Sequence, residues 1–70
     1  MAEVRAEMVA NVWKVLVSEG DQVDNGDTLV ILESMKMEIP VLAESPGIVT
    51  KLHVAEGDVV QEDELIAEIG

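Results

Sequence analysis

The feature that most constrains this chain is a repeat within its own sequence. When residues 1–33 are laid over residues 38–70, a shift of 37 positions without gaps, ten positions are identical. They include the run 19–21, which matches 56–58, and several unmatched positions exchange one apolar residue for another. A chain of 70 residues has room for one domain. The repeat therefore predicts a single domain, 1–70, with quasi-two-fold symmetry.

The composition of each half predicts β-strands. The apolar segments are short, rich in Val, Ile and Leu, and separated by Gly, Asp and Asn. Apolar residues do not recur at helical spacing over the length that a helix needs. Turn-forming residues cluster at 19–21, 24–27, 45–47 and 56–58. The predicted fold is all-β, a flattened β-barrel or sandwich of antiparallel sheets.

The repeat also predicts which side of the segment 12–17 faces the core. Lys14 lies over Lys51 and Leu16 lies over His53, so that side is expected to be exposed. Because side chains alternate along a strand, a shift of one residue would reverse the two sides. The core is then expected to receive Trp13, Val15 and Val17, with Leu52 and Val54 from the second half.

Two positions predict departures from a regular strand. Leu29 and Leu32 both match apolar residues of the second half, whereas Ile31 matches Glu68. Apolar positions three residues apart on one face predict a bulge or a strong twist. Pro40 has no N–H to donate to a neighbouring strand, which predicts that its strand lies at a sheet edge or contains a bulge.

The segment 34–37 is the part of the chain without a counterpart in the repeat. An apolar segment leads into it and another leads out, so we expect a hairpin turn with Lys36 near its tip. Hairpin turns usually carry Gly, Asn, Asp or Pro, whereas here a lysine stands between Met35 and Met37. Methionine recurs on surfaces that adapt to a partner. The pattern predicts an enzyme that docks on the turn and acylates Lys36.

The connector and its flanks resemble a known attachment motif. The Ala-Met-Lys-Met motif of biotin carboxyl carrier proteins and biotin-dependent carboxylases is similar to the run Glu33-Ser34-Met35-Lys36-Met37-Glu38. The likeness covers almost the whole chain, since 20–29 resembles the segment before the motif and 45–60 the segment after it. On this resemblance the chain is identified as a member of the biotinyl/lipoyl attachment family. Ser34 in place of Ala and Ala10 in place of Gly depart from the usual pattern.

The resemblance implies a fold and a function. The fold is a barrel-sandwich hybrid of two four-stranded antiparallel sheets, with the lysine at one end and the termini together at the other. Lys36 is implied to receive biotin from a biotin protein ligase. The tethered biotin then carries a carboxyl group between a biotin carboxylase and a carboxyltransferase, so the chain is a carrier rather than an enzyme. The residues expected to contact the ligase are Glu33, Ser34, Met35, Met37 and Glu38.

Two alternatives stay open on the sequence. Lys36 could carry lipoate, in a carrier of the 2-oxoacid dehydrogenase or glycine-cleavage type, or accept both groups. Lipoyl domains usually have Asp-Lys-Ala around the lysine, so Met35 and Met37 favour biotin. The other alternative is an unmodified binding or scaffold domain, in which Lys36 stays free. The acceptor substrate and the host carboxylase are not encoded in a recognisable way.

Composition argues against other functions. The formal net charge of −11 disfavours nucleic acid and anionic membranes, and predicts a monomer that meets basic partner surfaces. There is no cysteine, and His53 is the single histidine, so no catalytic group is expected. The acidic run 62–64 lacks the alternating ligands of a calcium loop, so no metal site is expected. No apolar leader or long apolar stretch occurs, which predicts a cytoplasmic protein.

Overall fold

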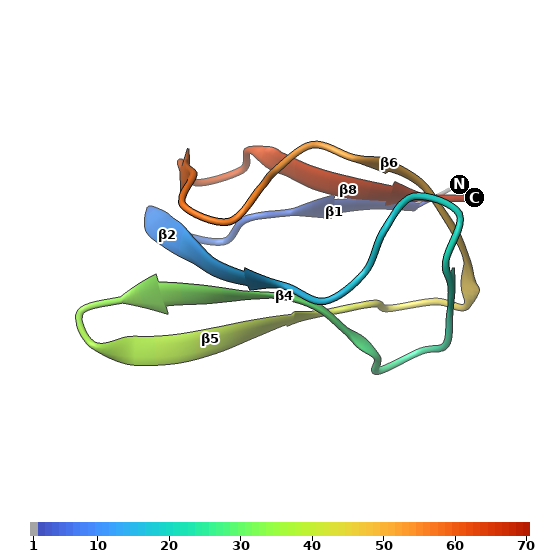
Figure 1. The fold of residues 1–70 in the computed structure, drawn as a ribbon, viewed down its shortest axis with the longest axis horizontal. Helices are drawn as coiled ribbons and strands as arrows, with labels where there is room; N and C mark the ends of the chain where they lie inside the picture. The colour runs from blue at the N-terminus through green and yellow to red at the C-terminus, as the bar shows by residue number, and fades with distance from the viewer. Residues whose placement is uncertain (1) are drawn as a thin grey trace.

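The computed structural model describes residues 2–70, and these residues form eight strands and no helix. Met1, the first residue of the repeat half 1–33, lies outside the described residues. The strands form two four-stranded antiparallel sheets, β1-β8-β6-β3 and β5-β4-β2-β7, stacked as two layers (Figure 1). The predicted all-β sandwich is confirmed. The strands are β1 (Ala2–Arg5), β2 (Ala10–Val15), β3 (Gln22–Val23), β4 (Thr28–Ser34), β5 (Met37–Leu42), β6 (Gly47–Leu52), β7 (Val59–Val60) and β8 (Leu65–Ile69).

The quasi-two-fold symmetry predicted from the repeat is present in the strand order. A shift of 37 residues places β1, β2, β3 and β4 over β5, β6, β7 and β8. If each strand is replaced by the strand that this shift places over it, the order β1-β8-β6-β3 becomes β5-β4-β2-β7, which is the order of the other sheet. Each half supplies the central pair of one sheet and both edge strands of the other. Neither half can therefore complete a sheet without its counterpart.

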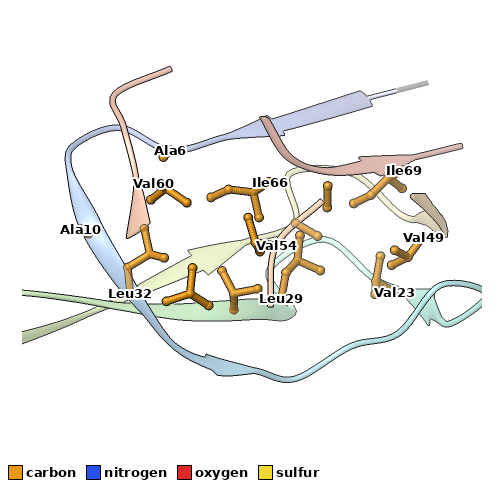
Figure 2. Close-up of a cluster of buried hydrophobic side chains, with 14 residues drawn as sticks. Ala6, Ala10, Val23, Leu29, Leu32, Val49, Val54, Val60, Ile66 and Ile69 are labelled. Atoms are coloured by element: carbon orange, nitrogen blue, oxygen red, sulfur yellow. The ribbon is translucent and has the colours of Figure 1, made fainter. Parts of the chain in front are cut away.

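The core between the sheets is built from aliphatic side chains alone. Figure 2 shows these side chains converging from both layers. A Val, Leu or Ile side chain contributes about 1.5–3 kcal/mol when it is fully buried. The buried side chains are Ala6, Ala10, Val12, Val23, Leu29, Val30, Leu32, Ala43, Val49, Val54, Val60, Ile66, Ala67 and Ile69.

The prediction that Trp13 faces the core is wrong. Its side chain is 42% exposed, whereas Val12 beside it is buried. Val12 pairs with Leu32 and Lys14 pairs with Ile31, so Trp13 is the extra residue of a β-bulge. A bulge breaks the alternation of faces, which places two neighbouring residues on the same side. Beyond it the predicted inward residues do pack against the core: Val15, Val17, Leu52 and Val54.

The two predicted departures from regular strands are both confirmed. The register of β4 against β5 shifts between Thr28 and Val30, which makes Leu29 an extra residue in the ladder. The bulge lets Leu29 and Val30 both enter the core, while Ile31 points to the outside. Pro40 lies in β5, an edge strand of its sheet, where its missing N–H interrupts no central ladder.

The repeated acidic turns tie the two halves together. Asp21 accepts a hydrogen bond from the Ser18 amide within its own turn, and Asp58 accepts one from the Ala55 amide. The glutamates of these turns reach across the molecule instead. Glu19 accepts from the Leu52 amide at 3.0 Å, and Glu56 accepts from the Val15 amide at 3.2 Å. Each half thus satisfies a strand amide of the other half.

Removal of buried atoms from the central strands should unfold a small domain readily. Leu29 is fully buried, so Leu29→Ala is expected to lower the free energy of unfolding by about 3–5 kcal/mol through lost burial and a residual cavity. Leu16→Ala removes the same atoms from a side chain that is 53% exposed. This control is expected to change the free energy by less than about 1 kcal/mol. Urea unfolding measures both, and equal losses would contradict the assignment of the core.

Candidate functional site

The predicted turn joins β4 to β5 with only two residues. Ser34 pairs with Met37 at the end of the ladder, which leaves Met35 and Lys36 to reverse the chain. Both have positive φ, 52° at Met35 and 64° at Lys36. Two central residues in the left-handed region are the mark of a type I′ hairpin turn. Its twist matches that of the strands, so β4 and β5 stay paired up to the tip.

This turn has an energetic cost that the sequence does not reduce. A left-handed conformation costs a residue with a Cβ atom roughly 1–2 kcal/mol, which is why Asn-Gly is preferred in such turns. Neither Met35 nor Lys36 belongs to the residue types that lower this cost. The six paired positions between β4 and β5 hold the turn in place. Strained residues held by a rigid surround are characteristic of functional sites.

The turn presents its side chains to solvent. Met35 is 91% exposed and Met37 is 64% exposed, and Lys36 is also exposed. Figure 1 shows the β4–β5 hairpin extending past the other loops at its end of the molecule. Within residues 2–70, no hydrogen bond or ion pair engages the Lys36 amine. The amine can therefore be approached by a reagent from outside the domain.

The remaining predicted site residues lie beside the turn on the same hairpin. Glu33 pairs directly with Glu38 across β4 and β5. The next pair, Leu32 and Ile39, packs in the core, so the two glutamates point to the outer side. Like charges that face each other across a sheet are destabilising. The five other predicted residues are thus brought together around Lys36, with Ser34 half-buried at the base of the turn.

The cavity formed by the described residues between β1 and β5 lies away from the turn. Its volume is about 380 Å³, and it is lined by residues that include Val4, Val41 and Ile69. No residue from 33–38 lines it. An exposed amine at a protruding tip fits a cofactor that is attached covalently and projects into solvent. The residues present therefore suit a tethered group rather than a bound one.

The other residues weighed from the sequence lie away from the turn. His53 is near the surface and its Nε2 lies 2.8 Å from a carboxylate oxygen of Glu68. The run 62–64 is an exposed turn closed by Glu64, whose carboxylate accepts a hydrogen bond from the backbone N–H of Gln61. Residues 2–70 contain no cluster of three or more His, Asp or Glu side chains suited to a metal. None of their segments is a helix capable of crossing a membrane.

Sequence comparison agrees with this geometry. The family model for biotin/lipoyl domains, described as "Biotin-requiring enzyme", matches residues 2–69. The biotinylated protein TB7.3 homolog of Mycobacterium leprae is 66% identical, with 99% of each chain covered. The biotin/lipoyl attachment protein of Bacillus subtilis is 47% identical over 94% of this chain and 90% of its own length.

Structural comparison places the same fold in a large enzyme. The Kluyveromyces lactis urea carboxylase superposes with a TM-score of 0.92 and 35% identity, over 99% of this chain and 6% of that one. The fold, the two-residue turn and the family match lead to one conclusion. The chain belongs to the biotin/lipoyl attachment domain family, whose members are carrier domains.

Trp13 is a surface residue that the sequence places incorrectly. Trp13 was expected in the core, yet it lies on the outer face of β2, with the Lys14 ammonium 5.5 Å from its ring centroid. The repeat contained a signal of this exposure. Trp13 matches the polar Thr50, whereas its buried neighbour Val12 matches Val49, which is also buried. The apolar or polar character of both matched residues therefore indicates the core side better than the size of one residue.

The strain at the turn can be tested by relieving it. Asn tolerates the left-handed region better than Met, so Met35→Asn is expected to raise the free energy of unfolding by about 0.5–1 kcal/mol. The side chain at position 35 is almost fully exposed, so little burial is lost. Met37→Asn is the matched control, because Met37 is also exposed but lies in β5 without positive φ. Urea unfolding that shows no gain at position 35 over this control would argue against stored strain.

Proposed function

We propose that this chain is a biotin carrier and that Lys36 is its attachment site. The observation that supports this most strongly is the exposed lysine at the tip of a strained two-residue turn. The family requires biotin by its description, and the Mycobacterium leprae relative is named as biotinylated. In this proposal the side chains that border the turn are read by a biotin protein ligase: Glu33, Ser34, Met35, Met37 and Glu38.

The attachment step needs only one functional group from this chain. The neutral Nζ of Lys36 attacks the carbonyl carbon of a biotinyl-adenylate supplied by the ligase. A C–N bond forms, the C–O bond to the adenylate phosphate breaks, AMP leaves and the nitrogen loses a proton. No described side chain contacts Nζ through a hydrogen bond or ion pair, so the base belongs to the ligase. The product is an amide, and Lys36 loses its positive charge.

After attachment, the module contributes proximity. Biotin supplies a ureido nitrogen that can hold a carboxyl group. Lys36 keeps that group on a flexible side chain at the protruding end of the domain, within reach of two active sites in turn. Tethering converts encounters in solution into local ones at high effective concentration. The partners in this proposal are a biotin carboxylase and a carboxyltransferase, as the occurrence of the same fold within a urea carboxylase supports.

Lipoate is the second candidate for the group on Lys36. The Bacillus subtilis relative is named as a biotin/lipoyl attachment protein, so a close relative is associated with both groups. The same exposed amine could form an amide with lipoate by the same chemistry. The module would then carry acyl groups or reducing equivalents rather than a carboxyl group.

The organisation of the protein follows from the same proposal. The chain acts as one module over 1–70, without catalytic groups of its own, and its net charge of −11 favours a monomer. We place it in the cytoplasm, where ATP is available for the formation of the adenylate.

Intact-mass spectrometry tests the attachment directly. The chain is co-expressed with a biotin protein ligase, and a parallel sample is co-expressed with a lipoyl ligase. One biotinyl group per chain is expected, and Lys36→Arg is expected to abolish it because an arginine cannot form the amide. Lys14→Arg and Lys51→Arg are matched controls on other strands and should be labelled fully.

The outcomes separate the candidate functions. Labelling with lipoate alone would reassign the chain to the lipoyl carriers. Labelling that persists in Lys36→Arg would place the site elsewhere. The absence of either group in the unmodified sequence would favour a binding or scaffold domain.

A further inference from the structure

The repeat provides an internal control for the outer faces of the two sheets. Each outward position on the β5-β4-β2-β7 sheet has a symmetry mate on the β1-β8-β6-β3 sheet. On the first of these sheets the outward positions include Trp13, Leu16, Ile31, Pro40, Leu42 and Val59. Their respective mates are Thr50, His53, Glu68, Glu3, Arg5 and Gln22. Six positions are therefore apolar on one face and polar or charged on the other, although the fold treats them alike.

These apolar residues form a connected surface, which we call the apolar face. Ile31 of β4 pairs with Pro40 of β5, and on its other side it pairs with Lys14 of β2, whose ammonium lies 5.5 Å from the Trp13 ring centroid. Trp13 adjoins Lys14 in β2 as the bulged residue. Leu16, Trp13, Leu42 and Val59 are between 42% and 56% exposed. On the opposite sheet Ile48, 41% exposed, is the comparable exposed apolar side chain. Folding does not require this asymmetry, because the symmetry-related positions of the other sheet adopt the same structure with polar or charged residues.

The apolar face is continuous with the Lys36 turn. Its central strands β4 and β5 are the two arms of the hairpin. Ile31 precedes Ser34 by three residues, which is about 10 Å along a strand. An enzyme that acylates Lys36 must bring its active site within one lysine side chain of the turn. Its surface must therefore lie against the strands next to the turn. An enzyme that acts later on a long tethered group has no such requirement.

The charges beside the apolar face favour a basic partner over a second copy of this chain. Glu33 and Glu38 stand opposite each other between the row of Ile31 and the turn. Two copies meeting through this face would bring these carboxylates together, and each copy carries a net charge of −11. A partner with Lys or Arg near its active site would instead neutralise the unfavourable pair and gain in association rate.

We propose that the apolar face, centred on Trp13, Ile31 and Pro40, is the docking surface for the biotin protein ligase. The ligase surface that fits it has an apolar patch, with basic residues between that patch and the active site. This inference rests on the proposed function of Lys36 and extends the recognised surface from the turn to the sheet. Trp13 is the expected anchor, because buried aromatic residues dominate the energetics of interfaces.

Steady-state kinetics of biotinylation test the docking surface. The substrate is the unbiotinylated chain, and the probe is a purified mycobacterial biotin protein ligase with biotin and ATP. Trp13→Thr copies its symmetry mate Thr50, and Pro40→Thr tests a second strand. Each is expected to raise KM by about tenfold with kcat unchanged, since a contact made equally before and during the reaction is lost. Ile48→Thr, the matched control of similar exposure on the other sheet, should leave KM unchanged.

Each result either supports the docking surface or overturns it. End-point mass spectrometry first establishes that every variant can be fully biotinylated, which also shows that the variants fold. Full labelling with the same KM for Trp13→Thr and Ile48→Thr would overturn the docking surface and leave the carrier function intact. A dimer of the original sequence in sedimentation velocity, lost in Trp13→Thr, would assign the face to a second copy and overturn the proposal. Failure of the original sequence to accept biotin would overturn both.

Discussion

The structure depends on the exchange of edge strands between the two halves of the chain. β2 and β4 form the centre of one sheet but are flanked by β5 and β7 from the second half, and the reverse holds in the other sheet. The core therefore forms only when both halves are present. The crossed hydrogen bonds of Glu19 and Glu56 to strand amides of the opposite half add to this mutual dependence. In a domain of this size such coupling is needed, because either half alone would bury too little surface.

The same exchange explains why there is one turn of this kind and where it lies. The chain passes from the first half to the second between β4 and β5, which are neighbours in one sheet, so a tight hairpin suffices. The symmetry-related neighbours are β8 and β1, whose adjacent ends are the two ends of the described chain. A closed turn at one end of the molecule and paired termini at the other thus follow from a single topology (Figure 1). The exposed side chains of the turn do not pack in the core, so the turn can carry a function without disturbing the fold.

The outer surface shows how one scaffold can hold two different faces. Most identical residues of the repeat lie in the core or in the acidic turns, where folding makes the same demand on both halves, whereas Lys14 and Lys51 are exposed. Six outward positions differ in kind: they carry aromatic, aliphatic or proline side chains on one sheet and charged or polar ones on the other. Because the fold is the same on both sides, folding alone does not require that difference.

The sequence alone determined the all-β class, the symmetry and the placement of Lys36 in a turn. It also restricted Pro40 to a sheet edge or a bulge, and the segment 29–32 to a bulge or a strong twist. These follow because the repeat, the short apolar segments on either side of 34–37 and the missing N–H of proline can all be read without knowing how the chain packs. The tertiary structure alone decided that a bulge falls at Trp13 and that the backbone of Met35 and Lys36 is left-handed. A bulge shifts the alternation of faces by one residue, and the segment 12–17 is apolar enough to accept either phase. Only the pairing with β4, and the two-residue gap between β4 and β5, resolve these choices.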